Sequence, residues 1–212
     1  MNTGEVLELF RGVPDRDTLA GFLRENDPEK IEEIRKAAEH TVLEHCGNKV
    51  YYRGLVEFSN VCALDCRYCG IRRSNTKVQR YTVSEDAIVE AARWCAGVRY
   101  GSLVLQSGER HDSDFVDLVE RVVRRVKNET VSPSLPHGLG VTLCVGEHSL
   151  ETYRRFREAG AHRYLLRIET TNPALFEAIH PGDQTLDSRL RSLDALREAG
   201  FAFVTVDMEG LL

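Results

Sequence analysis

The sequence predicts an α/β fold with a parallel sheet, preceded by a helical segment. From residue 50 onward, five short apolar runs alternate with amphipathic stretches, and no Asn-Gly hairpin signal separates them. The ending REAG occurs at 157–160 and at 197–200, and an apolar run follows it each time. Strands that alternate with helices pair in parallel through right-handed crossovers. This order leaves a β/α barrel and a doubly wound sheet as the candidates.

The first 49 residues predict a helical segment that precedes a core at 50–212. Pro28 opens the longest helical stretch and Gly47 ends it, as is typical of the first turn of a helix and of its end. Apolar residues recur between them at helical spacing, at Ile31, Ile34, Ala38 and Val42.

The core contains five expected strands separated by four expected helices. The strands are VEF near residue 56, SLVLQ at 102–106, GVTLCV at 140–145, RYLLRI at 163–168 and FAFVTV at 201–206. The helices are SEDAIVEAARWCAG, DFVDLVERVVRRVK, SLETYRRFREAG and SRLRSLDALREAG. Ser84 is expected to cap the first helix, and the glycine of each REAG ending to cap one of the last two. The segment 128–140 holds two of the six prolines and predicts a long surface loop.

Composition excludes several classes of protein. A chain of 212 residues, 42% of them hydrophobic and 29% charged, fits a globular protein with one sizeable core. Its formal net charge of -5 favours neither nucleic acid nor an anionic membrane as a partner. No apolar run approaches the ~18 residues of a membrane helix, and the first residues lack a signal-peptide pattern. Half of the six cysteines are clustered, which favours a metal in a reducing compartment and predicts a cytoplasmic protein.

Cys62, Cys66 and Cys69 lie within eight residues, directly after the first expected strand. The carboxyl ends of such strands carry the active sites of β/α barrels. A structural zinc site needs four ligands, and no nearby Cys or His pair completes one. A Cys-x-x-Cys redox pair leaves Cys62 without a role. Three thiolates on one loop can instead hold three irons of a 4Fe-4S cluster and leave the fourth iron without a protein ligand.

These cysteines resemble the signature of the radical S-adenosylmethionine (SAM) superfamily, C-x3-C-x2-C with an aromatic residue before the last cysteine. Tyr68 is that aromatic residue, and the resemblance implies that it lies near the adenine of SAM. It also implies that the open iron binds the amino and carboxylate groups of SAM. An electron from the cluster then cleaves SAM to methionine and a 5'-deoxyadenosyl radical. A zinc-binding structural domain and a metal-free loop are the alternative interpretations.

Polar residues at the ends of the later strands extend the resemblance. The superfamily has a Gly-Gly-Glu-like segment at the end of the second strand, which holds the methionine amino group of SAM. The corresponding residues in this sequence are Gln106, Ser107, Gly108 and Glu109. In the third strand, alternation places Thr142 and Cys144 on one face. Arg167 and Glu169 end the fourth strand and are costly to bury unless they are paired or bind a ligand.

Within the superfamily, the segments VEFSNVC, YCGIRRSN, QSGE, VTLCVGE and RIETTNP most resemble the HydE family, whose members help to mature the active-site cluster of FeFe-hydrogenase. The resemblance runs from about residue 25 to about residue 200 and implies a TIM-like (β/α) barrel. It makes Glu169 a ligand of bound SAM and Arg189 the partner of the SAM carboxylate. Thr142 falls where the family has a threonine that lines the cavity, whereas Cys144 stands where a serine is expected.

The same resemblance implies a substrate and partners. The substrate is a small molecule, in that family an iron–cysteine synthon delivered by a partner enzyme. Other hydrogenase maturation proteins and an electron donor are implied as partners, whereas nucleic acid and a membrane are not. Methylornithine synthase and biotin synthase share the cysteine loop, so a radical SAM enzyme of either kind is an alternative.

The number of expected strands predicts an incomplete barrel. A full (β/α) barrel has eight strands and ~250 residues, whereas this sequence offers about five strands. Its ending, Asp207 to Leu212, offers no helix that would close the sheet. We therefore expect a core that is truncated at its C-terminus and exposes apolar sheet surface. An inactive, truncated fragment that binds a cluster is a further alternative.

Overall fold

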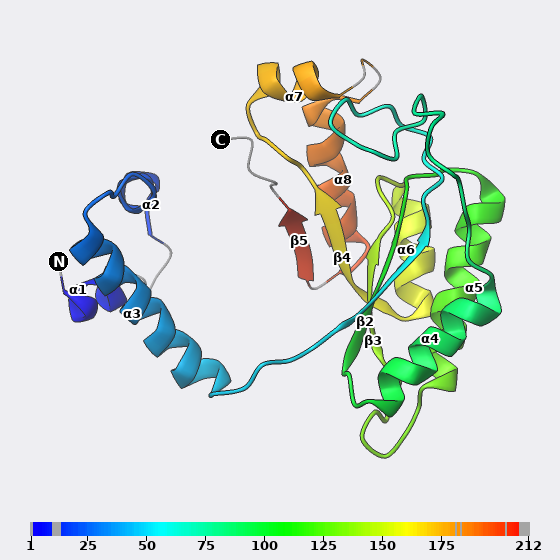
Figure 1. Cartoon of the computed structure of the whole chain (residues 1–212), viewed down its shortest axis with the longest axis horizontal. Coiled ribbons are helices and arrows are strands. Elements are labelled where there is room, and N and C mark those ends of the chain that lie inside the picture. Colours follow the sequence, from blue (N-terminus) through cyan, green and yellow to red (C-terminus); the bar gives the residue numbers. More distant parts are fainter. Residues whose placement is uncertain (1, 10–13, 181, 183, 202, 208–212) are drawn as a thin grey trace. The chain divides into compact units, whose positions relative to one another are not determined.

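The structure, a computed structural model, describes residues 2–9, 14–180, 182, 184–201 and 203–207. The chain divides into two compact units, Met1–Val50 and Tyr51–Leu212. Figure 1 shows the elements of both units.

The described residues of the smaller unit form three helices. They are α1 (Thr3–Leu9), α2 (Arg16–Leu23) and α3 (Pro28–Cys46). As predicted, α3 begins with a proline in its first turn and ends at Gly47, whose φ is 69°. α1 packs on α3, and each contributes a buried residue, Val6 and Ala37. The sequence did not predict α1, because a helix of seven residues with one buried side chain shows no recognisable period.

In the described part of the larger unit, five strands form one parallel sheet in the order β1-β2-β3-β4-β5. The strands are β1 (Gly54–Ser59), β2 (Ser102–Ser107), β3 (Gly140–Cys144), β4 (Ala161–Arg167) and β5 (Phe203–Asp207). Each strand adds beside the previous one, whereas a doubly wound sheet reverses its order at one point. The predicted parallel sheet is therefore confirmed, and its order is that of a (β/α) barrel.

Helices connect the strands, and most of these helices cover one face of the sheet (Figure 1). They are α4 (Glu85–Gly97), α5 (Ser113–Glu129), α6 (Leu150–Ala159), α7 (Pro173–Ile179) and α8 (Leu186–Glu198). α4 packs on α5, α5 on α6 and α6 on α8, so these four helices form one layer. The predicted caps are confirmed. The Ser84 hydroxyl accepts from the Ala87 N–H over 3.3 Å, and Gly160 and Gly200 have φ of 116° and 85°.

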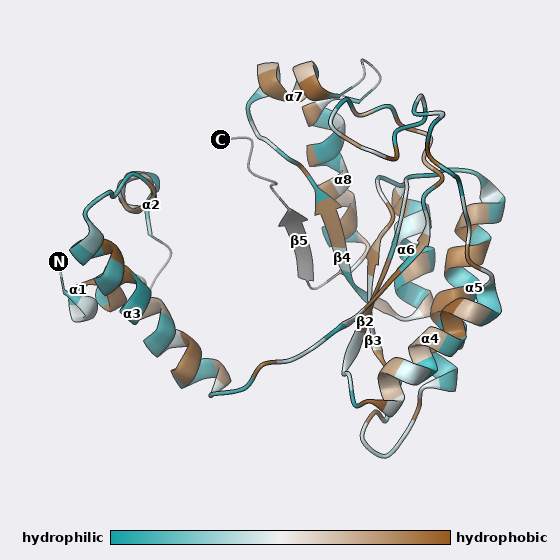
Figure 2. Ribbon diagram, in the orientation of Figure 1, coloured by the Kyte–Doolittle hydropathy of each residue, from teal (hydrophilic) through white to brown (hydrophobic). Residues whose placement is uncertain are grey.

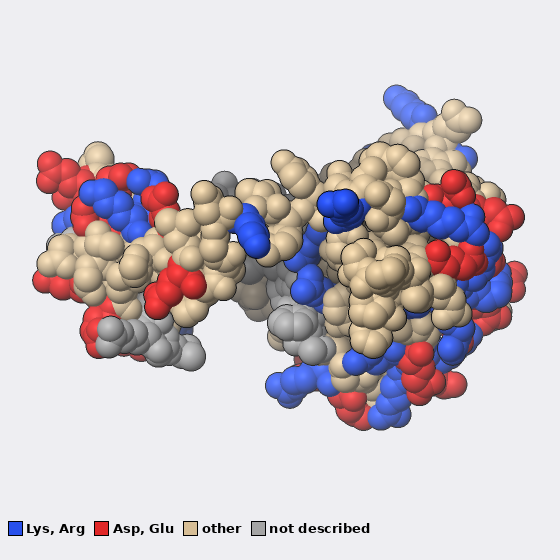
Figure 3. All heavy atoms as spheres, turned by 90° about the horizontal axis from the view of Figure 1, so that it is seen from below, with Lys and Arg blue, Asp and Glu red and all other residues tan. Residues whose placement is uncertain are grey.

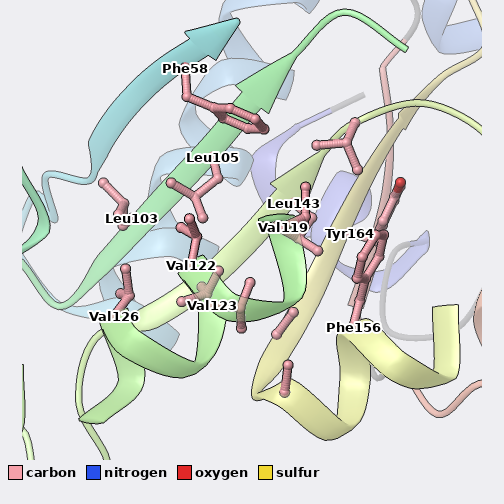
Figure 4. Packing of buried hydrophobic residues seen from close by; sticks show 14 of the residues in the cluster. Phe58, Leu103, Leu105, Val119, Val122, Val123, Val126, Leu143, Phe156 and Tyr164 are labelled. Atoms are coloured by element: carbon pink, nitrogen blue, oxygen red, sulfur yellow. The ribbon is translucent and has the colours of Figure 1, made fainter. Parts of the chain in front are cut away.

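The hydrophobic core lies between the helical layer and one face of the sheet (Figure 4). Leu103 and Leu105 alternate along β2 and are fully buried on this face. α5 contributes a stripe of valines at helical spacing, Val119, Val122, Val123 and Val126. Figure 2 shows hydrophobic and hydrophilic residues on each of the covering helices, as expected for amphipathic helices with one face on a core.

The opposite face of the sheet carries side chains in two rows. Strand pairing places Leu55, Val104, Thr142 and Arg163 in one row, and Glu57, Gln106 and Cys144 in the next row toward the carboxyl ends. Leu55, on this face of β1, is 59% exposed. In a closed barrel, this face would line the interior.

The loop between α5 and β3 and the end of the chain were both predicted to lack regular structure. The predicted surface loop at 128–140 starts later, because α5 continues to Glu129. The ends of this loop are pinned, since the Leu139 N–H donates to Thr130 Oγ1 over 2.8 Å and both residues are buried. The expected lack of a helix at the chain's end concerns residues 208–212, which lie outside the described residues.

Charged side chains of both signs are interleaved on the face of the larger unit that Figure 3 shows. Ion pairs join neighbouring helices, as where Arg125 of α5 contacts Glu85 and Asp86 of α4. None of the described helices has both the length and the apolar character that spanning a membrane requires.

Candidate functional site

A cleft of about 360 Å³ opens at the carboxyl ends of β1, β2 and β4. Its volume lies within the ~300–1,000 Å³ range of small-molecule sites. Most of the predicted site residues line it, namely Cys62, Tyr68, Cys69, Gln106, Ser107, Gly108, Glu109, Cys144, Arg167, Glu169 and Arg189. Cys66 and Thr142 are not among the lining residues. The parallel topology therefore gathers residues that are far apart in the sequence at one edge of the sheet.

The cysteine loop follows β1 and is held by backbone contacts with two other segments. The Ala63 N–H donates to the Glu109 carbonyl over 2.8 Å, next to the end of β2. The Arg67 N–H donates to the Ile179 carbonyl over 2.9 Å, at the end of α7. The loop is thus fixed between the ends of β2 and α7.

Arg80 fixes the outer part of the same loop. Its guanidinium donates to the carbonyl oxygens of Asn60, Ile71 and Arg72 over 2.6 to 2.7 Å. A guanidinium presents five N–H donors in a fixed fork and can satisfy several carbonyls at once. One side chain therefore sets the path of the chain before and after the cysteines. Sequence reasoning missed it, because a single arginine in a polar loop has no distinguishing pattern.

The three thiols of the loop are close enough to affect one another. Burial, followed by the neighbouring Cys62 and Cys69, raises the pKa of Cys66 to about 11. Burial also raises the pKa of Cys62. Cys62 and Cys66 therefore favour their neutral form, because a buried anion without a partner is costly.

Three free cysteines on one short loop are a donor set that suits an iron–sulfur cluster. Among the described residues, no group of three or more His, Cys, Asp or Glu is arranged to hold one metal ion. A single zinc ion would draw its sulfur ligands to about 2.3 Å from itself. In a 4Fe-4S cluster each thiolate binds a different iron, so the three sulfur atoms lie further apart.

Two glycines allow other segments to approach the site closely. A Cβ at Gly108 would overlap the Val61 carbonyl oxygen and lie 2.8 Å from Cβ of Cys62. A Cβ at Gly146 would overlap the Glu109 carboxylate, and a φ of 90° also favours glycine there. A side chain at either position would displace the cysteine loop or Glu109.

Glu109 is 8% exposed and has two histidines in its surroundings. Nε2 of His111 lies 3.2 Å from Glu109 Oε1, and this contact raises the pKa of His111. His148 lies edge-on to His111 with ring centroids 5.6 Å apart. Burial, followed by the nearby His111, lowers the pKa of His148 to about 4. Sequence reasoning missed both histidines, because neither belongs to a spaced motif.

Glu169 follows β4 in a tight turn and points back to the cysteine loop. Its φ of 60° is left-handed, which costs a residue other than glycine ~1–2 kcal/mol. The side chain is 4% exposed, and the Tyr68 hydroxyl donates to Oε1 over 3.0 Å. Burial, followed by Cys66 and Glu169, raises the pKa of Tyr68, so the phenol stays a proton donor. Backbone strain at a buried acid is a common mark of a functional site.

His180 supports Tyr68 from the end of α7. Its Nε2 lies 3.4 Å from the Tyr68 hydroxyl, and the two rings meet edge-on with centroids 5.6 Å apart. The imidazole stacks on Phe176 at a centroid distance of 3.9 Å. His180 is 2% exposed, so this packing fixes the Tyr68 ring over the cleft.

Arg189 lies in the first turn of α8 and is 6% exposed. Its Nη1 donates to the Arg167 carbonyl over 2.6 Å. Its Nε lies 2.6 Å from Oε1 of Glu147, an ion pair without the geometry of a hydrogen bond, since neither atom has a hydrogen-bond partner among the described residues. A guanidinium has five N–H groups, so Arg189 can also donate hydrogen bonds to a carboxylate that binds in the cleft.

Thr142 and Cys144 lie on one face of β3, as alternation predicts. Cys144 lines the cleft. Thr142 lies two residues further from the carboxyl end, is 5% exposed, and has an Oγ1 without a hydrogen-bond partner among the described residues. The structure therefore brings Cys144 to the cleft but keeps Thr142 away from its surface.

Comparison with known proteins shows which family the chain belongs to. The family model of the radical SAM superfamily matches residues 56–210. The FeFe-hydrogenase maturase subunit HydE of Thermotoga maritima is 38% identical over 213 aligned residues, which cover 100% of this chain and 58% of that protein. The 3-methylornithine synthase of Methanosarcina acetivorans is 26% identical over 87% of this chain and 51% of that protein. The chain spans about half the length of these curated relatives.

Solved structures show the same fold. HydG, a maturase of FeFe-hydrogenase, has a TM-score of 0.83 and 23% identity over 96% of this chain and 45% of its own. A methylornithine synthase has a TM-score of 0.76 and 24% identity over 95% of this chain and 57% of its own. The matched family model includes the three cysteines and extends over most of the sheet. The chain therefore belongs to the radical SAM superfamily.

Proposed function

We propose that this chain forms the cofactor site of a radical SAM enzyme of the HydE kind, which acts in the maturation of FeFe-hydrogenase. One observation carries the proposal. The cysteine loop, two buried carboxylates, Glu109 and Glu169, and the buried Arg189 meet at a single cleft. The identity of 38% to HydE, against 26% to 3-methylornithine synthase, supports the HydE kind.

In this proposal, the three thiolates of Cys62, Cys66 and Cys69 hold a 4Fe-4S cluster and leave one iron for SAM. A cluster bound there supplies the electron that cleaves SAM to methionine and a 5'-deoxyadenosyl radical. The protein's own part is to bind, orient and exclude water.

The other residues of the cleft position SAM. Arg189 provides a positive charge for the SAM carboxylate, and the turn at Gly108 and Glu109 provides groups for the amino end. Glu169 accepts hydrogen bonds from SAM, and Tyr68 lies where the adenine is expected. Glu169 and Arg189 are 4% and 6% exposed, so water competes little for their charges.

The substrate and the partners follow from the same proposal. The substrate is a small molecule, an iron–cysteine synthon in the HydE kind, and an electron donor and other hydrogenase maturation proteins are partners. We also propose a cytoplasmic location. None of the six cysteines forms a disulfide with another described residue, and iron–sulfur ligands must stay reduced.

Anaerobic reconstitution with iron and sulfide tests the proposal. The reduced protein is expected to give the EPR signal of a 4Fe-4S cluster, and SAM is expected to change that signal. With dithionite, the loaded protein is expected to form 5'-deoxyadenosine. Absence of a cluster, or a signal that SAM leaves unchanged, would overturn the proposal. A cluster that responds to SAM but yields no 5'-deoxyadenosine would identify a binding protein without turnover.

A further inference from the structure

Gln184 is a buried polar residue beside the cysteine loop that the proposed function does not use. It is 8% exposed and directly precedes Thr185, the N-cap of α8. The thiol of Cys66 donates to Gln184 Oε1 over 3.2 Å. The amide nitrogen of the same side chain, Nε2, is buried without a hydrogen-bond partner among the described residues. The Gln184 side chain therefore places an N–H donor without an acceptor close to the Cys66 thiol.

The contact between the thiol and Oε1 cannot persist when Cys66 binds iron. Iron ligands are thiolates, which accept hydrogen bonds but have no proton to donate. Oε1 of Gln184 would then face the sulfur lone pairs, while Nε2 would still have no acceptor. A half-turn about the last side-chain torsion exchanges the two ends of the carboxamide, which are nearly equal in size. This rotation removes the repulsion and gives the buried N–H an acceptor.

Gln184 and Tyr68 both place a side-chain donor beside Cys66. The hydroxyl of Tyr68, a nearby donor, is directed to Glu169. The backbone beside Gln184 is fixed, because the Thr185 hydroxyl accepts from the Ser188 N–H over 3.0 Å.

We propose that in the iron-loaded protein the side-chain amide of Gln184 donates an N–H to the Cys66 thiolate and raises the reduction potential of the cluster. Hydrogen bonds to the ligand sulfur atoms offset the negative charge of the cluster. This charge increases when the cluster gains an electron, so the hydrogen bonds stabilise the reduced state more than the oxidised state. Gln184 acts through Cys66 and is a positioning residue. This inference rests on the proposed binding of a 4Fe-4S cluster at the three cysteines.

Gln184→Met tests the inference, because it keeps most of the side-chain volume and removes the N–H. A redox titration of the reconstituted protein, followed by EPR, is expected to give a more negative midpoint than the wild type. At the wild-type midpoint, the ratio of reduced to oxidised cluster should fall by up to about tenfold, equivalent to about 59 mV for one electron. Gln184→Glu should shift the midpoint further in the same direction, since a carboxylate adds negative charge. Gln79 is exposed, so the matched control Gln79→Met should leave the midpoint unchanged.

The iron content separates this inference from the proposed function. Four irons with an unchanged or more positive midpoint in Gln184→Met would overturn the inference and leave the proposed function intact. Failure of the wild-type protein to form any cluster would overturn the proposed function itself.

The wild-type protein carries a second test that does not depend on a variant. With 15N in the glutamine side-chain amides, pulsed EPR of the reduced cluster is expected to show a 15N coupling. The coupling should persist in Gln106→Met, because the Gln106 amide donates to Glu57 over 2.9 Å. A four-iron wild-type protein without any 15N coupling would overturn the inference.

Discussion

The hydroxyl of Tyr68 donates to Oε1 of Glu169 over 3.0 Å, across a separation of 101 residues in the sequence. This contact joins the cysteine loop to the strained turn after β4. It also gives a buried carboxylate a hydrogen-bond donor, without which its burial would be costly. Two predicted site residues therefore support each other before any ligand binds.

Tyr68→Phe is expected to lower the free energy of unfolding of the cluster-free protein by about 1.5–3 kcal/mol, the usual contribution of a hydrogen bond to a charged group. Urea denaturation followed by circular dichroism measures the change. Iron uptake should stay at the wild-type level, because the phenol is not a proposed iron ligand. In the control Tyr51→Phe, the altered ring is 75% exposed, so the change should stay within about 0.5 kcal/mol. Equal losses in the two variants would contradict this role of Tyr68.

Cys66→Ala is expected to abolish assembly of the four-iron cluster, because it removes one of the three proposed ligands. Colorimetric iron analysis and EPR after reconstitution measure the effect. Cys46→Ala and Cys95→Ala are matched controls, since Cys46 is exposed at the end of α3 and Cys95 is buried in the core. Both should keep the wild-type iron content, although Cys95→Ala should lower stability by ~1 kcal/mol. A normal iron content in Cys66→Ala would refute its assignment as a ligand.

Arg189→Met is expected to destabilise the protein by about 3–5 kcal/mol, because it leaves the Glu147 carboxylate in a partly buried position without its cation. Adding Glu147→Gln should recover part of this loss, with a coupling of about 0.5–3 kcal/mol between the two sites. Chemical denaturation of the wild type, both single variants and the double variant measures the coupling. Strictly additive losses would show that the pair contributes no interaction.

Stability is expected to fall with pH because of His148. Its pKa is about 4 in the folded protein, against an ordinary value of 6.5, so the unfolded chain binds more protons between these two values. The contribution is fully present above about pH 6.5 and is lost as the pH falls toward about 4, by roughly 3 kcal/mol in all. His148→Phe keeps an aromatic ring beside Phe115 and Phe156 and removes the titration.

Denaturation of both proteins at a series of pH values from 7 to 4 measures this effect. As the pH falls, the free energy of unfolding of the wild type should decrease relative to that of His148→Phe. Glu109 and His111 lie beside position 148 in both proteins, so the difference reports what the His148 imidazole adds, including its interaction with His111. A difference that is independent of pH would contradict the assignment.

The sheet and the cysteine loop could be predicted because their signals are local. Apolar runs, the caps at Ser84 and Gly160, and the spacing of the three cysteines are all visible within short windows. The roles of the later site residues were predicted through the family resemblance. Arg167 and Glu169 have a local signal, because two charges end an apolar strand, whereas an isolated Arg189 has none.

The supporting contacts could not be predicted, because they depend on how distant loops run. Cys66 and Gln184 are 118 residues apart and meet only because the cysteine loop and the start of α8 reach the same edge of the sheet. Arg80 likewise acts on carbonyl groups whose direction is set by the folded loop. The left-handed backbone of Glu169 could not be predicted from the sequence, since only glycine, and to a lesser degree Asn, Asp and His, favour that conformation.

Thr185 begins α8 between the glutamine that touches a thiol and the arginine that faces the cleft. Gln184 and Arg189 therefore both lie at the start of α8, and a displacement of α8 along its axis would move both side chains. If Gln184 and Arg189 have the roles proposed above, such a displacement would alter the hydrogen bond to Cys66 and the position of the guanidinium in the cleft at the same time.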